Sequence, residues 1–135
     1  MALVSAARQN RAKPVNRLND LGAKEWIPET VSVWVQRGLG QKHEHAQIEK
    51  LHPAPFSYQD IGRLIRFFTK SGEMVLDPFV GVGSTLKAAA IERRKGIGIE
   101  LNKKYAELAR ERLVTEVDPA ILHSKIGRAS CRERV

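Results

Sequence analysis

The sequence predicts an α/β protein that contains part of a doubly wound parallel sheet, and three observations support this fold class. Two short apolar runs lie at residues 74–76 and 96–99, and a segment suited to a helix follows each of them. The first run ends at Asp77, in a turn rich in glycines and hydroxyl groups. Strands that alternate with helices form parallel sheets, and their buried strands are nearly continuous apolar runs. The stretch "EMVLDPFVGVGSTLKAAAIERRKGIGIE", residues 73–100, therefore predicts strand, turn, helix and strand.

The clearest helix is predicted at residues 57–72. Ser57 can cap its first turn, with Asp60 three residues later, and Gly72 is a typical helix end. Its apolar face consists of Tyr58, Ile61, Leu64, Ile65 and Phe68.

Two further helices are predicted, one before and one after the second apolar run. The first extends from Ser84 to about Arg93. The second follows Asn102, a residue type that favours the cap position. Its apolar face consists of Tyr105, Leu108, Ala109 and Leu113.

A separate strand is predicted near residue 33, closed by Gly38, because apolar and other residues alternate there. The alternating valines are Val31, Val33 and Val35. We expect Trp34 to serve packing. Residues 41–50 are polar and predict a surface loop, and the HEH triplet at residues 43–45 lacks the spacing of an HExxH zinc site.

The composition predicts a single basic domain. The chain has 135 residues, a formal net charge of +8 and a pI of about 10.0, which favours a polyanionic partner. No run of 18 apolar residues and no signal peptide is present in the sequence, so we expect a cytoplasmic protein.

Both ends of the chain differ from the middle. Residues 1–20 form a basic arm that is either a solvated terminus or a phosphate-contacting segment. Residues 126–135, "IGRASCRERV", read as ATC GGA AGA GCG TCG TGT AGG GAA AGA GTG, which resembles a sequencing adaptor translated in frame. We therefore expect residues 125–135, including Cys131, to be non-native and exclude them from the fold. The predicted domain is residues 21–124, in a natural protein that continues past about Ser124.

The predicted turn has the features of a ligand site at the carboxyl ends of two strands, where ligands of open parallel sheets bind. Gly81 and Gly83 allow positive φ angles and a close approach of the backbone to a ligand. Glu100, one residue past the second predicted strand, can accept hydrogen bonds from both hydroxyls of a ribose. The pattern therefore predicts a nucleoside ligand.

The glycine spacing favours a nucleoside without phosphates. A dinucleotide site requires GxGxxG, and the third glycine position is occupied here by Leu86. Asp77 would repel a pyrophosphate but suits a cationic amino-acid group. S-adenosylmethionine combines such a group with a ribose and carries no phosphate.

Three motifs in order resemble a known family. "DPFVGVGST", "GIGIELNKKY" and the preceding "LHPAPFSYQDIGRLIRFFTKSGEMVLD" are similar to DNA methyltransferases that methylate the amino group of adenine or cytosine. The similarity covers about residues 50–113, and "NRLNDLGAKEW" also resembles prokaryotic and phage members. Ser84 before Thr85, and Ser57 in place of a proline, depart from the family pattern. The resemblance implies a Rossmann-like methyltransferase fold, double-stranded DNA as partner, and no metal or membrane.

The resemblance also implies the residues that contact the cofactor. The turn around its methionine and ribose consists of Asp77, Pro78, Phe79, Gly81, Gly83, Ser84 and Thr85. Glu100 is expected to hold the ribose, and Leu101 or Asn102 to contact the adenine. His52, Pro53 and Phe56 are expected to line the methionine end.

The catalytic segment of this family, [DNS]PP[YFW], is absent from the sequence, which has six prolines and no Pro-Pro pair. That segment accepts the amine hydrogens and stacks on a base flipped out of the duplex. We expect it to lie downstream of this chain, so the chain is predicted to be a C-terminally truncated fragment, inactive alone and poorly soluble because of an unpaired sheet edge.

Two other interpretations remain open from the sequence. One is half of an NAD-dependent oxidoreductase domain, and the other is a basic DNA-binding protein that has the methyltransferase fold without its catalysis.

Overall fold

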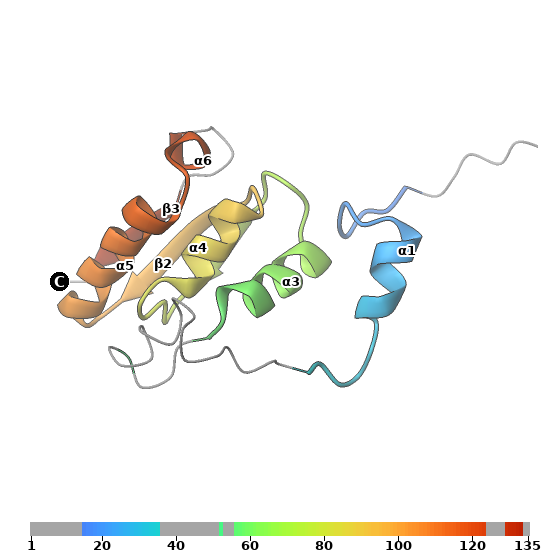
Figure 1. The fold of residues 1–135 in the computed structure, drawn as a ribbon, viewed down its shortest axis with the longest axis horizontal. Coiled ribbons are helices and arrows are strands. Elements are labelled where there is room, and N and C mark those ends of the chain that lie inside the picture. The colour runs from blue at the N-terminus through green and yellow to red at the C-terminus, as the bar shows by residue number, and fades with distance from the viewer. Residues whose placement is uncertain (1–14, 36–51, 53–55, 124–128, 134–135) are drawn as a thin grey trace, which may run out of the picture.

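The computed structural model describes residues 15–35, 52, 56–123 and 129–133 (Figure 1). The HEH triplet at residues 43–45, and Pro53, lie outside these residues. The described elements, in chain order, are helix α1 (Ala23–Trp26), 3-10 helix η1 (Ile27–Glu29), helix α3 (Tyr58–Phe68), strand β1 (Met74–Asp77), helix α4 (Ser84–Ile91), strand β2 (Lys95–Glu100), helix α5 (Lys103–Glu116), helix α6 (Pro119–His123) and strand β3 (Ala129–Glu133).

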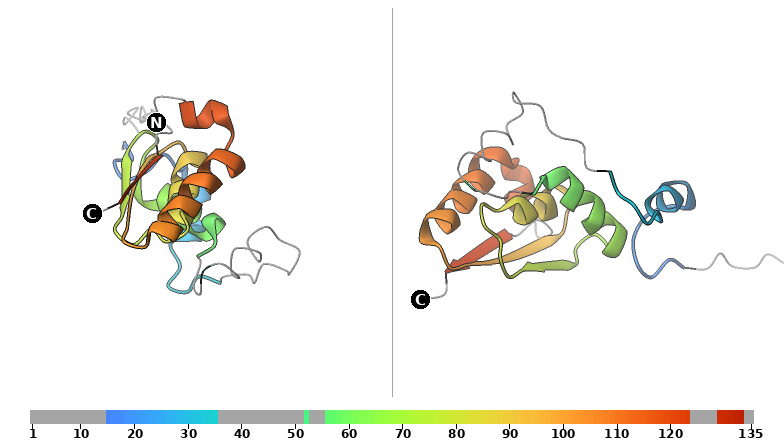
Figure 2. Two further views of the ribbon diagram at one scale, coloured as in Figure 1. Left: turned by 90° about the vertical axis from the view of Figure 1, so that its left-hand side faces the viewer. Right: turned by 90° about the horizontal axis from the view of Figure 1, so that it is seen from below.

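The strands form a parallel sheet in the order β1-β2-β3, as the alternation of strands and helices predicts. Asp77 pairs with Gly98, so β1 and β2 end at the same edge of the sheet. Helices α3, α4 and α5 lie on one face (Figure 2). The α/β prediction is therefore confirmed, with a small parallel sheet.

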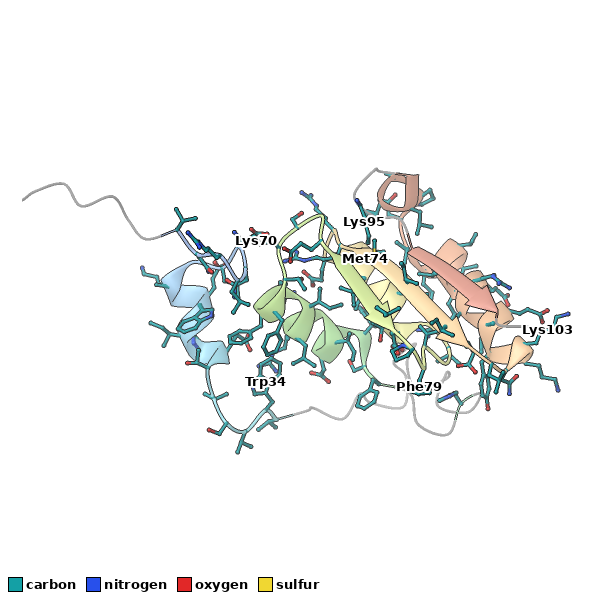
Figure 3. The ribbon with its side chains drawn as sticks, turned by 180° about the vertical axis from the view of Figure 1, so that it is seen from behind. Trp34, Lys70, Met74, Phe79, Lys95 and Lys103 are labelled. Carbon is teal, nitrogen blue, oxygen red and sulfur yellow. The ribbon has the colours of Figure 1, made fainter. Side chains whose placement is uncertain are left out.

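The opposite face of the sheet is open in the described part of the chain (Figure 3). Met74 and Leu76 are each 60% exposed on this side. The expectation that this apolar run is buried is therefore wrong for these two side chains, since the described helices cover the other face.

The close packing of α4 on β2 depends on glycine in the strand. A Cβ on Gly96 would lie 2.8 Å from Cδ2 of Leu86. Leu86 is fully buried, with Val80 and Ala90 in the same apolar cluster. In dinucleotide-binding folds the third glycine of GxGxxG lets the helix pack closely on the strand. Here Gly96 in the strand permits the same close packing, so Leu86 can occupy the third position in the helix.

The predicted helix caps are confirmed. Ser57 Oγ accepts a hydrogen bond from the backbone N–H of Gln59 at 3.3 Å, and Asn102 Oδ1 accepts one from Lys104 at 3.0 Å. Helix α3 ends at Phe68, earlier than predicted, because the backbone at Thr69 is extended. Gly72 instead occupies the turn before β1, with a φ of +84°.

The strand predicted near residue 33 is not present: residues 30–35 are irregular. Val33 and Val35 are exposed, and no described strand pairs with this segment. Trp34 does serve packing, since it meets the Phe67 ring edge-on at 6.5 Å and lies 4.5 Å beneath the Arg63 guanidinium. An alternating pattern of apolar residues does not by itself form a strand where no neighbouring strand supplies hydrogen bonds.

Both chain ends contribute more to the fold than the sequence predicts. Asn19, assigned to the basic arm, is fully buried and donates to the carbonyl of Phe67 at 2.7 Å. Backbone hydrogen bonds pair β3, from the segment excluded on sequence grounds, with β2. No strand was predicted there, because the segment was set aside for its resemblance to a translated adaptor. The non-native origin of residues 125–135 stays a prediction.

Candidate functional site

The glycine turn, residues 77–85, joins β1 to α4 and contains the first predicted site carboxylate. Asp77 Oδ1 accepts a hydrogen bond from the backbone N–H of Phe79 at 2.9 Å. Its other oxygen, Oδ2, accepts one from the hydroxyl of Thr85 at 2.6 Å. Asp77 thus closes the turn across its own length, and each oxygen can accept a further hydrogen bond.

The second predicted carboxylate, Glu100, is the last residue of β2 and contacts the same turn. Its Oε2 accepts from the backbone N–H of Gly81 at 2.9 Å, and its Oε1 accepts from Asn102 at 2.8 Å. The backbone N–H of Val80 also donates to the carbonyl of Ile99 at 3.1 Å. The two strand ends, which the sequence predicts at the same edge of the sheet, are therefore joined through the turn by hydrogen bonds that the sequence did not predict.

Both glycines of the turn have positive φ angles, +52° at Gly81 and +84° at Gly83, but they serve different contacts. A Cβ on Gly81 would lie 3.2 Å from Nε2 of His52, which faces the pocket. A Cβ on Gly83 would lie 2.9 Å from Cβ of Ala109 on α5. Gly81 therefore keeps space at the pocket, and Gly83 allows α5 to pack behind it.

A pocket of about 60 Å³ opens at the glycine turn. Ligand sites usually measure about 300–1,000 Å³, so the enclosed part suits one end of a ligand. The lining residues are His52, Phe56, Asp77, Phe79, Val80, Gly81, Val82, Ser84 and Thr85.

One polar atom in this pocket has no partner among the described residues. Ser84 is 6% exposed, and its Oγ is buried without a hydrogen bond. A buried hydroxyl normally has a partner, because an unsatisfied one costs roughly 1–3 kcal/mol. Ser84 is also the first residue of α4, whose N-cap Gly83 offers no side-chain hydrogen bond to the helix start. The site therefore contains a hydroxyl whose hydrogen-bonding capacity the described residues do not use.

The aromatic residues of the site differ in their surroundings. His52 meets the Tyr105 ring edge-on, with the ring centroids 4.7 Å apart. Phe56 and Phe79 are exposed, and Phe79 is 87% accessible to solvent (Figure 3). A solvent-exposed aromatic ring beside a pocket is suited to stacking on a planar ligand.

The structure brings together seven of the predicted contact residues as pocket lining: His52, Phe56, Asp77, Phe79, Gly81, Ser84 and Thr85. Pro78 is exposed, and Leu101, at 85% exposure, does not line the pocket. The Asn102 side chain caps α5. Val80 and Val82 also line the pocket but were not predicted. Their position on either side of Gly81 in the sequence could have identified them.

The described part of the chain has neither a metal-binding cluster nor a membrane-spanning helix. The described residues contain no group of three or more His, Cys, Asp or Glu side chains placed to hold a metal ion. None of the described helices has the length and apolar character needed to cross a membrane.

Comparison with known proteins gives a family match over most of the chain. A model of the DNA methylase family, N6_N4_Mtase, matches residues 4–111. The orphan methyltransferase M.BamHII of Bacillus amyloliquefaciens is 37% identical over 87 residues, which is 62% of this chain and 32% of that protein. The type II methyltransferase M.MjaI of Methanocaldococcus jannaschii is 40% identical over 75 residues, 56% of this chain and 24% of that protein.

The type II methyltransferase M.HpaI of Haemophilus parainfluenzae is 42% identical over 67 residues, 50% of this chain and 21% of that protein. The chain thus spans about a third or less of the length of these relatives. No solved structure matches it.

Proposed function

This chain belongs to the DNA methylase family, and from that membership we propose that it is the S-adenosylmethionine-binding part of a DNA methyltransferase. The methyl acceptor we propose is the exocyclic amine of adenine or cytosine in double-stranded DNA. The complete domain would have a Rossmann-like fold. Family membership favours this function over the NAD-binding alternative.

The observation that carries the proposal is the pair of carboxylates at neighbouring strand ends. Asp77 ends β1, Glu100 ends β2, and the backbone of Gly81 lies between them in hydrogen-bond contact with Glu100. A ligand with a cation at one end and a ribose at the other complements this arrangement. Among common nucleoside cofactors, S-adenosylmethionine has both groups and no phosphate for Asp77 to repel.

The pocket supports a specific orientation of the cofactor. Asp77 would accept from the ammonium of its methionine end, and the hydroxyl of Ser84 would donate to the carboxylate of the same end. The positive end of the α4 dipole favours that carboxylate as well. The buried, unpartnered Ser84 Oγ supports this fit, because a ligand oxygen would satisfy it.

The remaining predicted contacts follow from this orientation. Glu100 would hold the ribose hydroxyls, with Leu101 and Asn102 toward the adenine. His52, Phe56 and Phe79 would form the wall along the methionine and the methyl group, together with Pro53. When bound, S-adenosylmethionine supplies an electrophilic methyl group on a sulfonium, and this chain would bind and orient it.

Methyl transfer itself would require a segment beyond this sequence. The chain has no Pro-Pro pair and therefore no [DNS]PP[YFW] segment, and it spans about a third or less of its relatives. We propose that the chain binds the cofactor but does not methylate DNA alone. A radioactive methyl-transfer assay on duplex DNA tests this, and incorporation by this chain would contradict it.

Calorimetric titration of the 135-residue chain with S-adenosylmethionine, and separately with NADH, tests the cofactor. We expect S-adenosylmethionine to bind, and Glu100→Gln to weaken it about tenfold, since one charge-assisted hydrogen bond contributes about 1.5–3 kcal/mol. Glu107→Gln, at an exposed position of α5, is the matched control and should bind normally. Binding of NADH without S-adenosylmethionine would overturn the proposal.

A further inference from the structure

We propose that Arg112, a buried arginine of α5, positions the backbone of the glycine turn for the cofactor while remaining outside the pocket. Glu116, which Lys87 also contacts, holds its guanidinium in place. The inference rests on the proposed function, because it takes the glycine turn as the S-adenosylmethionine site. No sequence motif singles out these three residues, and their roles follow from contacts in the structure.

Arg112 contacts the glycine turn from α5, outside the pocket. Its Nη1 donates to the carbonyl of Val82 at 2.5 Å, in a fully buried hydrogen bond between residues 30 positions apart. The arginine is 4% exposed, and it does not line the pocket. It therefore acts on the turn from behind.

Two hydrogen bonds fix the peptide unit that joins Val82 to Gly83, one at its carbonyl oxygen and one at its N–H. The carbonyl of Val82 accepts from Arg112, and the N–H of Gly83 in the same peptide donates to the carbonyl of Val80 at 2.9 Å. Gly83, on one side of this unit, has a positive φ angle, as does Gly81 earlier in the turn. Glycine has more backbone freedom than other residues, so this peptide needs external contacts to keep one orientation.

The orientation of this peptide determines the position of pocket walls. Val82 and Ser84 lie on either side of Gly83, and both line the pocket. A rotation of the Val82–Gly83 peptide would move the Val82 side chain and the unpartnered Ser84 hydroxyl. Arg112 therefore influences the ligand site through the main chain.

The Arg112 guanidinium belongs to an ion cluster with Glu116 and Lys87, and Glu116 fixes its position. Arg112 Nε donates to Glu116 Oε1 at 2.9 Å, and Nη2 donates to Oε2 at 3.2 Å. Lys87 Nζ also contacts Glu116 Oε2, at 2.7 Å, and lies 4.0 Å from the centroid of the Tyr58 ring. The cluster thus connects α5, α4 and the beginning of α3.

The geometry of the cluster requires arginine at position 112. Its planar fork places two N–H donors on Glu116 while a third nitrogen reaches Val82. A lysine has one nitrogen and can preserve the charge pair with Glu116 without reproducing all three hydrogen bonds. Arg112→Lys therefore separates the ion pair from the contact to the turn.

The test compares cofactor affinity and folding stability in the full 135-residue chain. We expect Arg112→Lys to bind S-adenosylmethionine about tenfold more weakly, because without this hydrogen bond the turn would adopt its binding-competent orientation only about a tenth of the time. Its melting temperature should fall by several degrees, because the buried Val82 carbonyl loses its donor while the charge pair with Glu116 is kept, so affinity is measured well below the melting transition. Arg110→Lys, an exposed arginine on the same helix, is the matched control and should leave both quantities unchanged.

A second measurement covers the case in which Arg112→Lys does not fold. In the wild-type chain, the Arg112 Nε–H signal in a nitrogen-15 NMR spectrum should shift when S-adenosylmethionine is added, although this side chain does not line the pocket. An arginine that merely joins α4 to α5 would give an unchanged signal. An unchanged signal, or wild-type affinity of a folded Arg112→Lys, overturns the inference.

The outcomes separate this inference from the proposed function. If wild-type protein fails to bind S-adenosylmethionine, the proposed function fails and the inference with it. If wild-type protein binds, and Glu100→Gln weakens binding while Arg112→Lys does not, the function stands and the inference fails.

Discussion

The two ends of the sheet both contain polar side chains, but those side chains are satisfied to different degrees. At the amino end, each nitrogen of the buried Arg94 guanidinium donates to a protein oxygen of Thr69 or Glu92. At the carboxyl end, Asp77 and Glu100 accept one hydrogen bond per oxygen, and the Ser84 hydroxyl has no partner among the described residues.

This difference separates a structural role from a binding role. Buried groups that find all their partners within the protein stabilise the fold and have little capacity left for a ligand. Groups that retain lone pairs or donors beside a pocket can bind one. We therefore expect substitutions at the amino end to change stability, and most substitutions at the carboxyl end to change cofactor affinity.

The largest predicted effect comes from two glycines, one at each end, that share a φ of +84°. Gly72→Ala has open space around the added Cβ, so it should cost about 1 kcal/mol of unfolding free energy, for backbone strain alone. Gly83→Ala adds an overlap with Ala109 at 2.9 Å, so it should cost about 3–4 kcal/mol. Chemical denaturation of both variants measures the difference.

Equal losses for the two glycine variants would contradict this prediction. Such a result would mean that α5 can move away from the glycine turn without cost. It would also weaken the argument that the turn is supported from behind.

The next largest effect concerns Arg94 at the amino end. Arg94→Met should lower the unfolding free energy by about 3 kcal/mol, because it leaves the carbonyls of Thr69 and Glu92 without this buried donor. Affinity of the folded protein for S-adenosylmethionine should be unchanged, measured by calorimetry below the melting transition. Arg93→Met, an exposed neighbour, is the control. A tenfold loss of affinity in Arg94→Met would show that the two ends are coupled.

A smaller effect on unfolding free energy distinguishes the buried polar side chains of Asn19 and Ser84. Asn19 donates to Phe67 and accepts from Asn16 and Leu21, so Asn19→Ala should cost about 2 kcal/mol. Ser84→Ala removes a hydroxyl that no described residue hydrogen-bonds, so stability should change by less than about 0.5 kcal/mol. Its affinity for S-adenosylmethionine should instead fall roughly fivefold or more. Normal binding by Ser84→Ala would remove this hydroxyl from the proposed site.

The sequence predicted the carboxyl end better than the amino end, for a physical reason. At Asp77, Gly81 and Glu100, local chemistry is specific: a tight turn requires glycine, and a carboxylate is the last residue of each strand. Asn19 and Arg94 depend on partners 48 and 25 residues away, so no local pattern identifies them.

The same reasoning explains one error in the predicted elements. Val33 lies in an alternating pattern, but no described strand pairs with it. Strand β3, in the segment set aside as non-native, pairs with β2 through its backbone. Strand formation depends on a partner that the local sequence does not contain. The Arg112 contact to Val82 was missed likewise, because it joins two elements 30 residues apart.

The smallest predicted effect is a pH dependence that arises behind the carboxyl end. Burial raises the pKa of the Glu116 carboxyl, but hydrogen bonds and charge from Arg112 and Lys87 outweigh it, so the pKa lies below its ordinary value of 4.5. A lowered folded-state pKa stabilises the protein above about pH 4.5, and this stabilisation is lost as the pH falls through the folded value. The effect is modest, because Glu116 is only partly buried and solvent screens the charges.

Glu116→Gln removes this titrating group, so comparison with the wild type isolates its contribution to stability. The difference in unfolding free energy between the wild type and Glu116→Gln should be constant above about pH 5 and should shrink as the pH falls below 4.5. Glu111→Gln, at an exposed position of the same helix, should run parallel to the wild type. If Glu116→Gln also runs parallel to the wild type from pH 7 to pH 3, the cluster does not stabilise the ionised carboxylate. The glycine turn would then depend on Arg112 alone for its support from behind.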